Sequence, residues 1–85
     1  MKTVESSACN VAFGQFIKLK RLKKEISQAE VAAQIGVTQS LYSRIEAGDR
    51  SVDLAMMINL CNFLGINPNE FLAQYIAKSR RFLKK

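Results

Sequence analysis

Apolar residues recur at spacings of three and four along most of the chain, and no segment alternates apolar and polar residues with the period of two that is typical of strands. The first periodic segment predicts a helix over residues 11–24, with Phe13 and Ile17 on its apolar face. Residues 1–10 are largely polar and predict a flexible N-terminal tail. We therefore expect one all-α domain over residues 11–85.

Two short helices with a tight turn between them are predicted in the middle of the chain. Ser27 is a candidate N-cap, and Glu30 stands three residues later, as in a capping box. Gly36 can adopt the left-handed conformation that ends this helix. Thr38 can then cap the next helix, which runs to about Ala47. Together these signals predict a helix-turn-helix over residues 28–47.

A fourth helix is predicted after the loop that follows Gly48. Asp53 or Ser51 can cap it, and it ends near Gly65. Its apolar residues are spaced three and four apart, so they are expected to form one buried face. This face comprises Leu54, Met57, Leu60, Cys61 and Leu64.

A fifth helix is predicted over residues 68–83. Asn67 can cap it, Pro68 takes its first position, and Glu70 completes a capping box. A small helical core needs only the start of this helix, so its apolar stripe is left for a second subunit to cover. We expect the helix to form a homodimer interface; the rival reading is a basic amphipathic helix on a membrane. The residues of the stripe are Leu72, Tyr75, Ile76, Ser79, Phe82 and Leu83.

The amino-acid composition reduces the number of function classes that fit this chain. The chain carries 13 Lys and Arg against 7 Asp and Glu, a net charge of +6, which attracts nucleic acid or anionic membranes. It has no histidine, which excludes His-based catalysis and His-bearing zinc sites, and Cys9 and Cys61 stand too far apart for a metal motif. Paired catalytic acids and a Gly-rich phosphate loop are also missing. We expect no enzymatic activity, no metal and no cofactor.

Localisation is inferred by default. The first residues contain no apolar run of signal-peptide length, and no stretch approaches the about 20 apolar residues of a transmembrane helix. We therefore expect a cytoplasmic protein.

The second helix of the predicted pair carries the chemistry of base recognition. Positions 39, 40, 43, 44 and 47 share one helical face, which is polar and lacks an acid. Gln39 can pair with two atoms of adenine, and Arg44 with two atoms of guanine. With Ser40, they are the candidate base-reading residues.

Residues 13–72 resemble the phage repressor and Cro-type helix-turn-helix family, also called the XRE family. The resemblance is carried by Phe13-Gly14, Ser27-Gln28, Ile35-Gly36-Val37-Thr38, Ile45-Glu46 with Gly48, and Leu64-Gly65-Ile66-Asn67-Pro68-Asn69-Glu70-Phe71. It implies a compact five-helix, lambda-repressor-like DNA-binding domain. Phage repressors are a standard example of a recognition helix docked in the major groove.

The resemblance also implies roles for individual residues. It places Gln39, Ser40 and Arg44 against bases, and Gln28 against the DNA backbone, where it can also brace Gln39. It pairs Arg21 with Glu46 in an ion pair between the first and third helices, which we assign to folding. Three hydroxyl residues fall near phosphates, and for Arg50 phosphate contact and simple solvation are equally open. The hydroxyl residues are Ser27, Thr38 and Ser43.

The sequence departs from the family at the end of the first helix. Glu25 replaces the usual Gly, so that turn is expected to be extended or strained. Lys20 stands where an apolar residue is common, and Leu19 where a polar one is.

These observations predict a sequence-specific transcriptional regulator, either a repressor or a controller-type autoregulator, that binds a palindromic operator as a homodimer. The alternative is an antitoxin-type protein that binds DNA and also neutralises a partner protein. An exposed apolar patch outside the dimer helix would favour the alternative.

Overall fold

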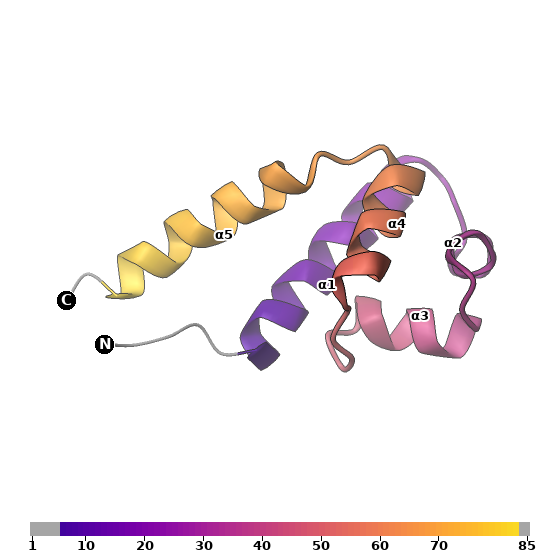
Figure 1. Ribbon diagram of the computed structural model, residues 1–85, viewed down its shortest axis with the longest axis horizontal. Coiled ribbons are helices and arrows are strands. Elements are labelled where there is room, and N and C mark those ends of the chain that lie inside the picture. Colours follow the sequence, from indigo (N-terminus) through magenta and orange to yellow (C-terminus); the bar gives the residue numbers. More distant parts are fainter. Residues whose placement is uncertain (1–5, 84–85) are drawn as a thin grey trace.

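The computed structural model describes the backbone of residues 6–83 and the side chains of residues 6–77 (Figure 1). The described backbone folds into five helices and contains no strand, which confirms the all-α prediction. The helices are α1 (Ser6–Lys23), α2 (Gln28–Ile35), α3 (Gln39–Glu46), α4 (Leu54–Leu64) and α5 (Pro68–Leu83).

The first helix starts earlier than its apolar pattern predicts. It begins at Ser6, so the expected tail is wrong for residues 6–10; residues 1–5 lie outside the described residues. Cys9 and Asn10 are half-buried. Polar residues can continue a helix when neighbouring elements cover part of it, because packing rather than propensity supplies most helix stability in proteins.

The core lies between the first four helices, with α1 at the centre of the arrangement (Figure 1). Every one of these helices contributes at least one side chain that is fully buried. Phe13 and Phe71 extend the core towards the start of α5. The fully buried side chains are Ile17, Val31, Tyr42, Ile45, Leu60 and Leu64.

Gly14 lets the C-terminal end of α3 approach α1 very closely. A Cβ atom at this position would lie 2.5 Å from the backbone oxygens of both Ile45 and Glu46. No side chain fits there, so a larger residue would push α3 away from α1. The position of α3 relative to the core therefore depends on this glycine.

The buried face of α4 is shorter than predicted. Asp53 caps the helix, with its Oδ1 accepting a hydrogen bond from the Met56 amide at 2.7 Å. Leu60, Cys61 and Leu64 are buried, but Leu54 is 72% exposed. The expectation that Leu54 belongs to the core is wrong: it lies on the exposed side of the first turn of α4, whereas Met57 is half-buried against the core.

Of the α5 residues whose side chains are described, 68–77, those near the start of the helix pack on the rest of the protein. Phe71 is buried and its ring contacts Phe13 and Phe16 of α1, while Tyr75 stacks on Phe71. The helix then runs clear of α4 towards its C-terminal end (Figure 1). The carboxylate of Glu70 pairs with Lys20 Nζ at 2.8 Å, so it serves to hold α5 on α1 instead of closing the expected capping box.

Candidate nucleic-acid interface

Helices α2 and α3 form a helix-turn-helix whose ends are defined by the predicted residues. Ser27 Oγ accepts a hydrogen bond from the Glu30 amide, and Thr38 Oγ1 accepts one from the Leu41 amide, both at 3.1 Å. Gly36 ends α2 in the left-handed conformation, with φ of 78°. Each capping hydroxyl uses its oxygen as an acceptor, so its own hydrogen stays free to be donated to a phosphate.

Helix α3 has one buried face and one exposed face. Tyr42 and Ile45 anchor it in the core. Gln39, Ser40 and Arg44 are all exposed on the other side; we call these three residues the reading face. The structure therefore gathers the three candidate base-reading residues on one accessible surface. Ser43 is half-buried at its flank, and Arg50 is exposed in the following loop.

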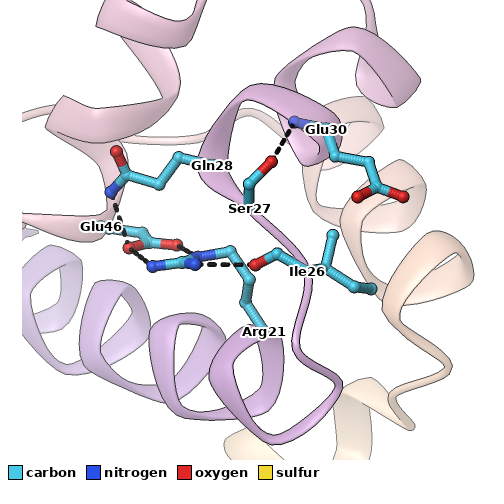
Figure 2. A network of polar contacts seen from close by, with 6 residues as sticks. All are labelled: Arg21, Ile26, Ser27, Gln28, Glu30 and Glu46. Atoms are coloured by element: carbon cyan, nitrogen blue, oxygen red, sulfur yellow. Dashed lines mark hydrogen bonds and ion pairs between the residues drawn. The ribbon is translucent and has the colours of Figure 1, made fainter.

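A buried polar network holds α3 to the two preceding helices (Figure 2). Arg21 donates from Nε to Glu46 Oε2 at 2.5 Å and from Nη2 to Glu46 Oε1 at 3.1 Å. Its Nη1 donates to the backbone oxygen of Ile26 at 2.8 Å. The predicted ion pair is thus present, and it joins α1 to α3.

Gln28 also belongs to this network. Its Nε2 donates to Glu46 Oε1 at 3.0 Å (Figure 2). The side chain therefore braces the end of α3 through Glu46, whereas the sequence suggested a brace on Gln39. Glu46 receives three hydrogen bonds from two helices, an arrangement that sets the angle between α2 and α3.

The network shifts the pKa values of its ionisable side chains. Burial alone would raise the pKa of Glu46, but the hydrogen bonds from Arg21 and Gln28 and the charge of Arg21 hold that pKa below its ordinary value. The hydrogen bond with Glu46 raises the pKa of Arg21 against the effect of burial. Burial, with the nearby Glu46 carboxylate, raises the pKa of Tyr42, whose phenol therefore stays neutral. Arg21 and Glu46 are therefore both ionised at neutral pH.

Asp49 is a residue of this surface that the sequence reasoning missed. Its Oδ2 lies 3.4 Å from Arg44 Nε. The available signal was an acid directly after Gly48, since a left-handed glycine turns the chain back over the last turn of a helix.

Other kinds of site find no support in the described residues. Residues 6–77, whose side chains are described, contain no cluster of acidic or cysteine side chains that could hold a metal ion. Within the same stretch no helix combines the length and the hydropathy needed to cross a bilayer.

Comparison with known proteins identifies the family. A family model described as Helix-turn-helix matches residues 17–71, which include the whole of α2, α3 and α4. The chain belongs to the XRE-type helix-turn-helix family. This confirms the resemblance noted in the sequence.

Two of the similar proteins are a control protein and a restriction-modification controller protein. Control protein C.MunI from a Mycoplasma species is 39% identical over 66 residues, which are 74% of this chain and 86% of that protein. The structure of the restriction-modification controller protein C.AhdI from Aeromonas hydrophila superimposes with a TM-score of 0.70 at 34% identity, over 75% of this chain and 97% of that one.

Of two further matches, one has lower sequence identity and the other is a longer protein. The clp gene regulator ClgR from Corynebacterium glutamicum shares the fold, with a TM-score of 0.72 at 20% identity over 88% of this chain and 85% of that chain. The HTH-type transcriptional regulator YqaE of Bacillus subtilis is 31% identical over 65% of this chain, which spans only 47% of YqaE. Family and fold together make this helix-turn-helix protein a DNA-binding transcriptional regulator.

Proposed function

We propose that this regulator reads a palindromic operator as a homodimer, with the reading face of α3 in the major groove. The observation that carries the proposal is the division of α3 into a buried face and an exposed polar face that contains no acid. Such a surface suits a groove lined by phosphates. In a two-fold dimer the two copies of α3 would lie one DNA turn apart, about 34 Å.

The reading face supplies donors and acceptors for base edges. Gln39 pairs with adenine, Arg44 with guanine, and Ser40 with either kind of base. The free hydroxyl hydrogens of Ser27 and Thr38, together with Ser43 and Arg50, contact phosphates and fix the register of the protein on the duplex. Gln28 supports these contacts indirectly, because its hydrogen bond to Glu46 holds the end of α3 in place.

Helix α5 supplies the dimer interface. Leu72 and Ile76 are 42% and 50% exposed, although both are large apolar residues. Tyr75 is half-buried because its ring stacks on Phe71 of its own chain. The predicted interface residues Ser79, Phe82 and Leu83 lie outside the residues whose side chains are described. A second copy would remove the exposed apolar stripe from water.

The likeness to two control proteins favours regulation by occupancy of the protein's own promoter. Both C.MunI and the controller C.AhdI match most of this chain. We expect this regulator to act without a cofactor and to catalyse no reaction, because its sequence has no histidine, no paired catalytic acids and no Gly-rich phosphate loop. Its site of action is the cytoplasm.

An antitoxin-type role is the second candidate. Leu54 and Ile58 of α4 are exposed apolar residues outside the dimer helix. They lie four positions apart and therefore share one side of α4. A partner protein could cover them while α3 remains on DNA.

A fluorescence binding titration tests the main proposal. The full chain is titrated against duplex from its own upstream region and against a scrambled duplex, at two salt concentrations. Tighter binding to the upstream duplex that survives added salt is expected. Equal binding that salt abolishes for both duplexes would mean that only the net charge acts on that DNA.

A pair of variants at positions with amide side chains sharpens the result. Gln39→Ala should weaken binding to the upstream duplex by about 1–3 kcal/mol and binding to scrambled DNA by less. Asn62→Ala changes an exposed amide side chain of α4 and should change neither affinity. Equal losses for Gln39→Ala on both duplexes would contradict base reading.

A further inference from the structure

Asp49 places a carboxylate against the reading face. Its Oδ2 lies 3.4 Å from Arg44 Nε, and both side chains are more than half exposed. Of the ion pairs formed among the described side chains, only this one includes a residue of the reading face. Exposed ion pairs contribute little to folding, so stability does not account for its position.

The backbone brings Asp49 to this place. Gly48 has φ of 78°, and its amide donates to the oxygen of Ile45 at 3.1 Å. The Asp49 amide then donates to the oxygen of Arg44 at 2.9 Å. These bonds close the C-terminal end of α3 and turn the chain back over it. Asp49 therefore faces the last turn of α3 whenever the helix is folded.

The pairing leaves one edge of the Arg44 guanidinium available. Asp49 accepts from Nε, which is on the side of the fork. The terminal Nη1 and Nη2 groups can then donate together to O6 and N7 of a guanine. The carboxylate also repels phosphates, which would otherwise attract Arg44 on any DNA sequence.

We propose that Asp49 is a specificity-determining residue that orients Arg44 towards guanine and lowers its affinity for phosphates. Asp49 is a positioning residue, since it acts through Arg44. The inference rests on the proposed function, in which α3 reads bases.

Selection from a randomised duplex pool tests this role. The wild-type chain should select sequences with guanine at one position of each half-site. Asp49→Asn should reduce that guanine preference about fivefold or more, while other selected positions stay the same. On a scrambled duplex the variant should bind more tightly, with a salt dependence steeper by about 0.9 in log–log slope, because Arg44 is released to neutralise a phosphate.

Asp53→Asn is the matched control. It removes the same charge from the same loop, and asparagine can still accept the Met56 amide that Asp53 Oδ1 accepts now. This variant should keep the guanine preference. Thermal unfolding of both variants should follow the wild type, because neither substitution removes a buried contact.

The outcomes separate the two ideas. If Asp49→Asn keeps the wild-type preference, if Asp53→Asn loses it equally, or if the wild type selects sequences without guanine, the role of Asp49 is overturned while the proposed function stands. If the wild type enriches no sequence at all, sequence-specific reading itself is wrong.

Discussion

Arg21 of α1 binds both carboxylate oxygens of Glu46 in α3, and both side chains are buried. The planar guanidinium fork matches the two oxygens in a way that a lysine ammonium cannot. Gln28 adds a third hydrogen bond to the same carboxylate (Figure 2). The orientation of the reading helix is thus coupled to a buried charge pair.

Breaking this pair should destabilise the protein strongly. Arg21→Ala leaves Glu46 buried without its charged partner, and we expect a loss of about 3–5 kcal/mol in the free energy of unfolding, measured by urea denaturation. Lys20→Ala breaks the exposed pair with Glu70 and should cost less than about 1 kcal/mol. Similar losses for the two variants would contradict a structural role for the buried pair.

Stability should fall in acid because of Glu46. Its pKa is lower in the folded protein than in the unfolded chain, so the unfolded chain binds more protons as the pH falls. The contribution is fully present above the ordinary glutamate pKa, about 4.3, and is lost as the pH drops through the folded value. Urea unfolding across this range measures the effect.

Two carboxyl variants assign that pH dependence. Glu46→Gln should flatten part of the acid slope, since the titrating group is gone. Glu30→Gln, on the exposed side of α2, should keep the wild-type slope. A wild-type slope in Glu46→Gln would assign the acid sensitivity to other groups.

The turn after α1 stores backbone strain that glycine should relieve. Glu25 has φ of 58°, the left-handed region that costs an L-residue about 1–2 kcal/mol. Glu25→Gly should therefore increase the free energy of unfolding by up to about 1 kcal/mol, after the added freedom of the unfolded chain is subtracted. The gain should be seen as a higher melting temperature. Glu25→Ala keeps the strain and should give no such gain, whereas equal melting temperatures for the two variants would contradict the argument.

A charge on α5 should shift the protein towards monomer. Ile76 is exposed in the single chain, so Ile76→Glu should leave the fold intact and disfavour only a dimer that buries this position. Light scattering over a range of protein concentrations measures the change in mass. Leu22→Glu places the same charge on an exposed residue of α1 and should leave the mass unchanged. An unaltered mass for Ile76→Glu would rule out this part of α5 as the interface.

The sequence was sufficient to predict the bounds of those helices that begin and end at capping residues. Ser27, Gly36 and Thr38 set the bounds of α2 and α3 as predicted, because caps and left-handed glycines act within a few residues. The same local logic failed at Ser6 and at Leu54. In both places the outcome depends on whether another element covers the helix, which no local pattern records.

By itself, the sequence determined the helical class, the helix-turn-helix and the polar composition of the reading face, since spacing and capping are properties of nearby residues. The resemblance to the family already paired Arg21 with Glu46, but only the tertiary structure decided the partners of Gln28 and Asp49. Gln28 bonds Glu46, and Asp49 meets Arg44, because Gly14 admits α3 against α1 and Gly48 turns the chain back. The Gln28–Glu46 contact depends on how closely whole helices approach, whereas the Asp49–Arg44 contact depends on the conformation of the turn at Gly48.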